Sequence, residues 1–178
     1  MDSLLKWVEK IKLEISKSKA IISRRKTVKS ALMQRLFNIV FEQNDQVVPF
    51  YIEIRETDQW IVEFSKKFFF TFIRQYIAFQ SRNTEYFNSI DDYAMLIEAA
   101  KKEGFDYLIQ HIANFEYSEN KGYIDILWDL AREAQRSIAQ YKDERVLQII
   151  DEFQFINRYV FENSGDSIYI ILTTAQTY

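Results

Sequence analysis

The chain has no cysteine, one histidine, one proline and three glycines in 178 residues. Without cysteine, disulfides, thiolate metal sites and a cysteine nucleophile are all excluded. Because His111 is the only histidine, a histidine-rich metal centre is excluded as well. His111 stands between isoleucines in a helical stretch, which indicates a structural or surface residue. The scarcity of glycine and proline favours helix, since these two residues are its commonest interruptions.

Long apolar runs and a large charge excess are missing too. The densest apolar stretch, Phe68–Ile73, is far shorter than the roughly 20 residues that span a bilayer. The N-terminus alternates acidic and basic residues and has no signal-peptide core. Lys and Arg number 23 against 26 Asp and Glu, a net charge of −3, which does not indicate a nucleic-acid binder. We therefore expect a cytoplasmic protein with no membrane partner.

Apolar residues make up 48% of the chain and aromatic residues 16%. At this length, that composition predicts one globular domain with a sizeable core. The aromatic cluster Phe68–Phe70 is expected to belong to the core. Asp125 and Asp129 lie four positions apart in a predicted helix and are expected on its solvated face. The amphipathic N-terminal helix is expected to pack on the domain, because its polar residues are a mixture of Lys and Glu.

Two kinds of apolar pattern alternate along the chain. Spacings of three to four residues predict helices over 3–17, 29–43, 58–79, 89–102, 105–115 and 123–140. Ser89 and Asp92 resemble a capping box at the start of the fourth helix, and Gly104 is a stop signal after it. Short β-branched or aromatic runs predict strands over 19–23, 47–54, 145–150 and 167–173. Pro49 favours a sheet edge for the second of these strands.

Strands separated by helical stretches predict an α/β fold, with a parallel sheet of about four strands and flanking helices. One domain would span 1–178. It would comprise an N-terminal helix at 3–17, a core at 19–56 and 144–178, and a large helical insert at 57–142. An all-helical bundle remains an alternative, because short apolar runs are ambiguous by period alone.

A phosphate-loop candidate follows the first predicted strand. The segment Ser23–Ser30, SRRKTVKS, aligns with the pattern G-x-x-x-x-G-K-[ST] between a strand and a helix. Lys29 and Ser30 fill the last two positions, while Ser23 and Val28 replace the glycines. A helix N-terminus attracts phosphate oxygens. Lys29 could then reach the β- and γ-phosphates, and the Ser30 hydroxyl could bind Mg²⁺.

The rest of this segment is basic. Arg24, Arg25 and Lys26 add positive charge, and Thr27 completes the loop. Valine at a positive φ is strongly disfavoured. If the loop needs that conformation at Val28, the strain of about 1–3 kcal/mol weakens phosphate binding. The alternative interpretation of the segment is a basic, solvated turn before a helix.

Two carboxylates, Asp151 and Glu152, follow the third predicted strand. An aspartate at such a strand end can support a Mg²⁺ ion, and a neighbouring glutamate can orient or deprotonate an attacking water. Thr173 ends the fourth predicted strand and is a candidate γ-phosphate sensor. Ligands of open α/β sheets gather at the carboxyl ends of strands, so Lys29, Asp151 and Thr173 are expected at one edge. Buried strands with ordinary polar ends are the alternative.

Three segments, SRRKTVKSALMQRLF, VVPFYIEI and VLQIIDEFQ, resemble the archaeal-type ATPase family of AAA-related, STAND-like phosphate-loop NTPases. The resemblance implies ATP and Mg²⁺ as ligands, with Lys29 and Ser30 as phosphate and metal residues. It also implies a metal-shell role for Asp151 and a catalytic-base role for Glu152. The terminal strand would lie between the first and third strands. The chain stops soon after it, so the family's lid domain is expected to be absent.

The predicted function is therefore an ATP-binding phosphate-loop domain with weakened or lost hydrolysis. The alternative is a non-enzymatic interaction module on a degenerate NTPase fold. Such a module would bind a protein partner, or a second copy of itself, through the Phe-rich helices.

Overall fold

The computed structural model describes residues 1–13, 28–44, 46–163 and 166–167. The helices of this part are α1 (Asp2–Lys12), α2 (Lys29–Gln43), α3 (Ile61–Ser81), α4 (Tyr93–Lys102), α5 (Asp106–Asn120), α6 (Ile124–Tyr141) and the short α7 (Ile156–Tyr159). The strands are β1 (Val47–Glu53), β2 (Gln59–Trp60), β3 (Arg145–Asp151), β4 (Val160–Asn163) and β5 (Asp166–Ser167). Two 3₁₀ turns lie at Thr84–Phe87 and Phe153–Phe155.

The main sheet pairs β1 with β3 in parallel, in a register that runs from Val47 opposite Arg145 to Glu53 opposite Asp151. A smaller sheet has the order β2–β4–β5, with β2 and β4 parallel and β4 and β5 antiparallel. The fold is thus α/β and mostly helical, as expected, and the all-helical alternative is wrong.

Two of the four predicted strands are not covered by this description. The run at 19–23 and residues 168–173 of the last run lie outside the described residues. Ser167, the first residue of that run, lies in β5, which pairs with β4 and not with β1 or β3. Among the described residues, the main sheet therefore has two strands rather than about four.

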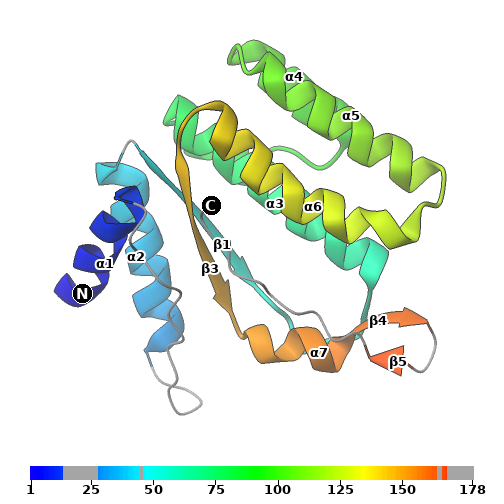
Figure 1. Ribbon diagram of the computed structural model, residues 1–178, viewed down its shortest axis with the longest axis horizontal. Helices are drawn as coiled ribbons and strands as arrows, with labels where there is room; N and C mark the ends of the chain where they lie inside the picture. The colour runs from blue at the N-terminus through cyan, green and yellow to red at the C-terminus, as the bar shows by residue number, and fades with distance from the viewer. Residues whose placement is uncertain (14–27, 45, 164–165, 168–178) are drawn as a thin grey trace.

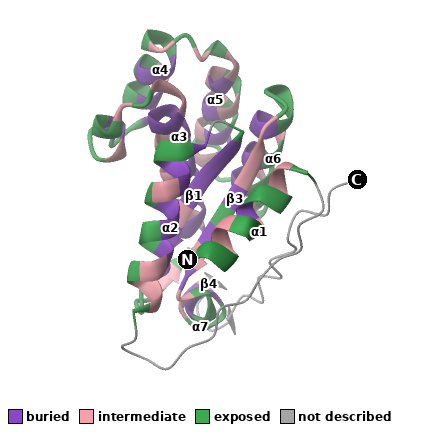
Figure 2. Ribbon diagram, turned by 90° about the vertical axis from the view of Figure 1, so that its left-hand side faces the viewer, coloured by how far each residue is buried: buried purple, intermediate pink, exposed green. Residues whose placement is uncertain are grey.

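Helices lie on both sides of the main sheet (Figure 1). α1 and α2 lie on one side, and α3 and α6 on the other, with α4 and α5 beyond them. α1 packs through Val8, which joins the same buried cluster as the strands, so the expected docking of the N-terminal helix is confirmed. Figure 2 shows β1 buried along most of its length, while α1 and α2 present exposed residues on their outer faces.

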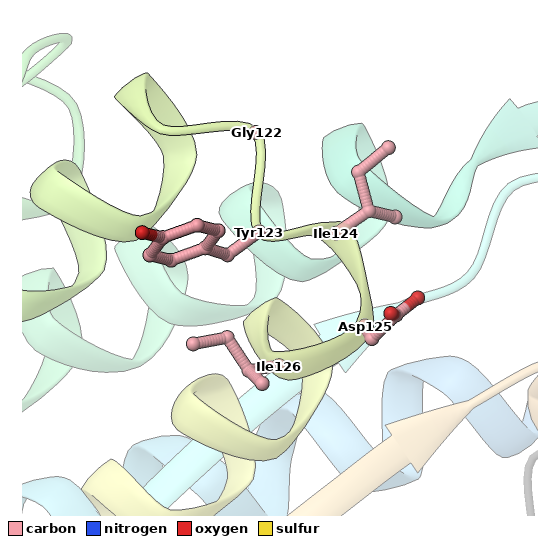
Figure 3. Close-up of a pocket in the computed structure, with 5 residues that line it drawn as sticks. All are labelled: Gly122, Tyr123, Ile124, Asp125 and Ile126. Atoms are coloured by element: carbon pink, nitrogen blue, oxygen red, sulfur yellow. The ribbon is translucent and has the colours of Figure 1, made fainter.

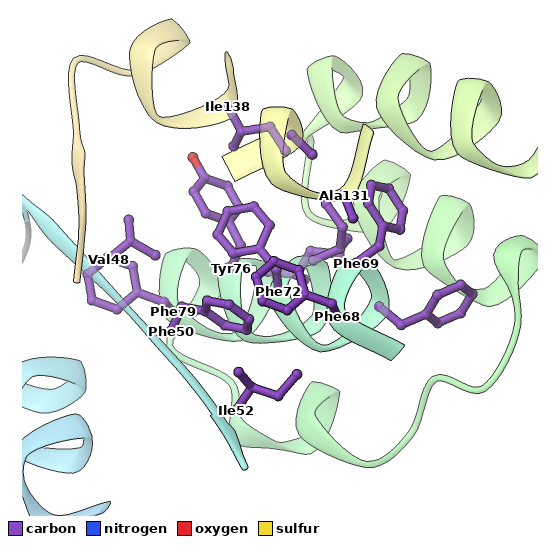
Figure 4. Packing of buried hydrophobic residues seen from close by; sticks show 14 of the residues in the cluster. Val48, Phe50, Ile52, Phe68, Phe69, Phe72, Tyr76, Phe79, Ala131 and Ile138 are labelled. Atoms are coloured by element: carbon purple, nitrogen blue, oxygen red, sulfur yellow. The ribbon is translucent and has the colours of Figure 1, made fainter. Parts of the chain in front are cut away.

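The phenylalanines of α3 form the centre of the core (Figure 4). Phe50 on β1 makes edge contacts with Phe68 and Phe72, at ring-centroid distances of 5.1 and 5.5 Å. Phe69 stacks on Phe115 of α5 at 4.3 Å. Alternation along β1 sends Phe50 toward α3 and Tyr51 toward α2, where Tyr51 meets Phe37. The expectation that the Phe68–Phe70 cluster belongs to the core is confirmed.

Two helix ends follow local signals. The carboxylate of Asp92 accepts a hydrogen bond from the Met95 N–H at 2.8 Å, so Asp92 caps α4. The proposed cap at Ser89 is wrong, because the chain becomes helical only at Tyr93. Gly104 has a φ of +74° after α4, a conformation that glycine adopts without strain. Among the described residues, no helix combines the length and apolar character needed to cross a bilayer.

Candidate functional site

The candidate site begins at the first residue of α2. No side chain caps this N-terminus, and its first turn has no acidic residue. Lys29 is the first helical residue, so its positive charge stands at the positive end of the helix dipole, which is locally unfavourable. Negative groups from another part of the chain are therefore needed to stabilise this start of α2.

Those negative groups come from the end of β3. Asp151 is the last residue of the strand, and Glu152 follows it with a φ of +57°. Adjacent side chains of a regular strand point to opposite faces. The left-handed conformation of Glu152 breaks this alternation, and both carboxylates contact the same ammonium group.

Lys29, Asp151 and Glu152 form an ion triad. The Lys29 ammonium nitrogen, Nζ, donates to Asp151 Oδ1 and, at 3.0 Å, to Glu152 Oε1. The Asp151 side chain is 1% exposed, compared with 20% for Lys29 and 28% for Glu152. The Glu152 N–H also donates to Asp151 Oδ1 at 3.0 Å. A fully buried carboxylate is thus paired with a cation that still reaches solvent.

The contacts within the triad favour its charged forms. Burial by itself would raise the pKa of Asp151, but hydrogen bonds from Lys29 and Ser30 outweigh burial and hold that pKa below its ordinary value of 3.8. Burial by itself would lower the pKa of Lys29. Its hydrogen bonds to Asp151 and Glu152 outweigh this effect and raise that pKa above 10.5.

A tyrosine on β1 contacts the other oxygen of the buried carboxylate. The Tyr51 hydroxyl donates to Asp151 Oδ2 at 3.3 Å. Burial raises the pKa of Tyr51 to about 12, a hydrogen bond from Gln34 opposes the rise, and the charge of Asp151 adds to it. Sequence reasoning missed Tyr51 and Gln34. One signal for Tyr51 lies in the parallel register, where Tyr51 pairs with Ile149. Ile149 is two residues before Asp151, so the side chains of Tyr51 and Asp151 lie on the same face of the sheet.

The structure brings together only part of the predicted site. Lys29, Ser30, Asp151 and Glu152 lie at one edge of the main sheet, so the expected convergence of Lys29 and Asp151 is confirmed. The predicted loop residues Ser23, Arg24, Arg25, Lys26 and Thr27, and the predicted sensor Thr173, lie outside the described residues.

Val28 differs from the expectation for a phosphate loop. Its φ is −66° and the residue is 80% exposed. A negative φ is ordinary for a β-branched residue. The strain expected at this position is therefore not present in this conformation of the loop end.

The donors at this edge suit a hard cation. Two carboxylates and a hydroxyl supply oxygen ligands, which Mg²⁺ prefers, and Mg²⁺ usually takes only one or two carboxylates together with substrate phosphates and water. In the described part of the chain, no cluster of three or more acidic or imidazole side chains is arranged to hold a metal ion. These donors are therefore too few to hold a Mg²⁺ ion without further ligands.

Three residues that the sequence predicted to be structural or on a solvated surface, His111, Asp125 and Asp129, lie in such places. His111 is half-buried on α5, and burial lowers its pKa against the opposing charge of Glu133. Asp125 and Asp129 are exposed on α6, and Asp129 pairs with Arg132 three residues on.

Comparisons with protein-family models, curated protein sequences and solved structures find no match to this chain.

Proposed function

We propose that the chain binds ATP together with Mg²⁺ at the edge of the main sheet where α2 begins and β3 ends. The observation that supports this most is the contact of Lys29 with Asp151 and Glu152. A lysine at a helix N-terminus beside strand-end carboxylates combines a phosphate-binding cation with oxygen ligands for a metal. In this proposal the sheet is that of a phosphate-loop NTPase, completed by the predicted strand at 19–23 and by residues 168–173 of the last predicted strand.

Nucleotide binding requires a rearrangement of the triad. Lys29 donates to both carboxylates, and it must turn from them to reach a phosphate. The carboxylates would then lose their cation, and a buried, unpaired Asp151 is unfavourable. A Mg²⁺ ion bound there would supply the missing positive charge. Asp151 and Ser30 would hold it, and the binding of nucleotide and metal is therefore expected to be coupled.

The same contacts favour slow or absent hydrolysis. Glu152 uses Oε1 to accept from Lys29 and Oε2 to accept from Gln154. A general base needs a free carboxylate oxygen within reach of the water that it activates. Glu152 has to give up at least one of these partners before it can act in that role.

Titration of a fluorescent ATP analogue in Mg²⁺ tests the proposal. Lys29→Met removes a charged phosphate contact worth about 1.5–3 kcal/mol, and the affinity is expected to fall about 10- to 100-fold. Lys66→Met is the matched control, since Lys66 pairs with Glu119 away from the site, and its affinity should equal that of the unaltered chain. Ser30→Ala supplies a second variant with a smaller structural change, and it should weaken binding only when Mg²⁺ is present.

Thermal melting gives an independent measurement. With free nucleotide at about ten times its Kd, the folded state gains about 1.4 kcal/mol, which raises the Tm by about 3–6 °C at this chain length. A melt unchanged by millimolar Mg-ATP, together with equal titrations of Lys29→Met and Lys66→Met, would contradict the proposal.

The alternative, an interaction module, needs a different surface from the one expected. The Phe side chains of α3 are buried, so they offer no contact surface. Instead, Tyr117, Tyr123, Ile124 and Ile126 are exposed around the α5–α6 connection. A shallow pocket of about 480 Å³ lies there, lined by Gly122–Ile126 (Figure 3). Concentration-dependent association that Ile126→Glu abolishes, with no effect of Mg-ATP on the melt, would favour this alternative.

A further inference from the structure

Three separate contacts fix the position of Tyr51 on β1. Its backbone lies in the β1–β3 ladder opposite Ile149. On the other edge of β1, the Gln75 side chain accepts from the Tyr51 N–H and donates to the Tyr51 C=O, both at 2.8 Å. Its ring makes an edge contact with Phe37 of α2, with centroids 6.3 Å apart. Backbone and ring are therefore held independently of the hydroxyl.

The hydroxyl lies between α2 and β3. It donates to Asp151 Oδ2 at 3.3 Å and takes part in a hydrogen bond with the Gln34 side chain. The opposite oxygen of the same carboxylate, Oδ1, accepts from Lys29 and from the Glu152 N–H. The Ser30 hydroxyl of α2 also donates to this carboxylate. The carboxylate of Asp151 is thus held from two directions, by Tyr51 of β1 on Oδ2 and by groups at the edge where α2 begins.

This arrangement fixes the rotation of the carboxylate. Asp151 has few side-chain torsions, and a partner on each oxygen leaves one orientation favoured. When Lys29 leaves Oδ1, Tyr51 still holds Oδ2 and keeps Oδ1 directed toward the N-terminus of α2. Partners of this kind, which orient a metal-binding carboxylate from behind, typically change metal affinity 10- to 100-fold.

We propose that Tyr51 is a positioning residue of the Mg–nucleotide site, and that it holds Asp151 in the orientation that accepts the metal. This rests on the proposed function. Tyr51 itself touches neither the nucleotide nor the metal. Its effect is therefore expected in the gain of nucleotide affinity that Mg²⁺ produces, and not in the affinity measured without Mg²⁺.

Tyr51→Phe tests the proposal, because it removes the hydroxyl and keeps the ring. The affinity for a fluorescent ATP analogue is measured in EDTA and in saturating Mg²⁺. In Tyr51→Phe, the ratio of the affinity in Mg²⁺ to the affinity in EDTA should fall about 10-fold, while the affinity in EDTA stays unchanged. The expected fall is at the lower end of the 10- to 100-fold range because 3.3 Å is a long hydrogen bond. Tyr107→Phe is the matched control, since the Tyr107 hydroxyl donates to Tyr76 away from the site.

A measurement without nucleotide separates this proposal from the proposed function. The Glu152 N–H donates to Asp151 Oδ1, so a less constrained carboxylate should speed amide hydrogen exchange at Glu152. Exchange there should be faster in Tyr51→Phe and unchanged in Tyr107→Phe. If the unaltered chain binds no nucleotide, the proposed function fails, and the positioning of Asp151 stands or falls on this exchange rate alone. If it binds normally, an affinity ratio in Tyr51→Phe equal to that of the unaltered chain overturns the proposal.

Discussion

Lys29 and Asp151 are 122 positions apart in the chain and in direct contact at one edge of the main sheet. The contact joins the first residue of α2 to the last residue of β3. It provides the uncapped helix start with a negative group and the buried carboxylate with a cation. The contact therefore offsets two unfavourable interactions: the positive charge of Lys29 at a helix N-terminus and the burial of the negative charge of Asp151.

Removal of the lysine alone is expected to destabilise the fold. Lys29→Met leaves Asp151, whose side chain is 1% exposed, without its cation. Loss of one partner from a buried ion pair costs about 3–5 kcal/mol, and the partial exposure of Lys29 reduces the expected cost to about 2–3 kcal/mol. Urea unfolding measures it. Lys66→Met is the comparison, because the more exposed Lys66–Glu119 pair should contribute about 1 kcal/mol or less. Equal costs for the two variants would show that burial of Asp151 does not matter.

The triad also predicts how stability depends on pH. The pKa of Asp151 lies below 3.8 in the folded chain, whereas the unfolded value is about 3.9. Between these values the unfolded chain binds more protons, so the free energy of unfolding falls as the pH is lowered through this interval. The pKa of Lys29 is raised above 10.5, so its contribution is complete below 10.5 and is lost as the pH rises through the folded value.

Asp151→Asn tests the part of this pH dependence that Asp151 contributes at acidic pH. Near pH 7 the variant should be less stable than the unaltered chain. The difference should shrink below about pH 4, since the protonated Asp151 then resembles an uncharged amide. Urea unfolding across the acidic range measures this difference. Asp129→Asn changes an exposed carboxylate that pairs with Arg132, and as the surface control it should change the free energy of unfolding at pH 7 by about 1 kcal/mol or less.

Glu152 offers a test of backbone conformation. Its φ of +57° is disfavoured for any residue with a Cβ, by about 1–2 kcal/mol. Both Glu152→Ala and Glu152→Gly lose the contact with Lys29, but only glycine relieves the strain. Glu152→Gly should therefore be more stable than Glu152→Ala by about 1 kcal/mol in urea unfolding. At Glu133, an exposed position within α6, the order should reverse, because alanine is favoured there by about 1 kcal/mol.

Much of this edge could be predicted from the sequence. The apolar period changes from helix-like to strand-like before Val47 and again before Arg145, so β1 and β3 were predictable within about a residue or two of their ends. The polar residues that follow β3 had to lie near the start of α2 if the strands were parallel, because strand carboxyl ends share one edge. The convergence of Lys29 and Asp151 follows from these two facts.

Other contacts could not be predicted, since periodicity does not specify which side chain reaches a backbone group. Gln75 occupies an ordinary helical position, and nothing in its neighbours indicates that it pairs with β1. The contacts of Tyr51 and Gln34 depend on how far α2 is shifted along the direction of β1 and β3, which the sequence pattern does not specify. The cap of α4 at Asp92 rather than Ser89 was missed for a related reason: both residues are good capping types, and only the path of the chain selects one.

Gln75 replaces a neighbouring strand at one point of β1. Its side-chain amide pairs with both backbone groups of Tyr51, and Gln75→Leu would leave an N–H and a C=O inside the fold without these partners. Each such group costs about 1–3 kcal/mol, so a loss of about 2–4 kcal/mol is expected in urea unfolding, with faster amide exchange at Tyr51. Gln75→Glu is the informative partner variant. A carboxylate still accepts from the Tyr51 N–H but repels the C=O, so exchange at Tyr51 should stay slow while stability falls. If Gln75→Leu exchanges at Tyr51 as slowly as the unaltered chain, another group must protect this edge of β1, and Gln75 has no such role.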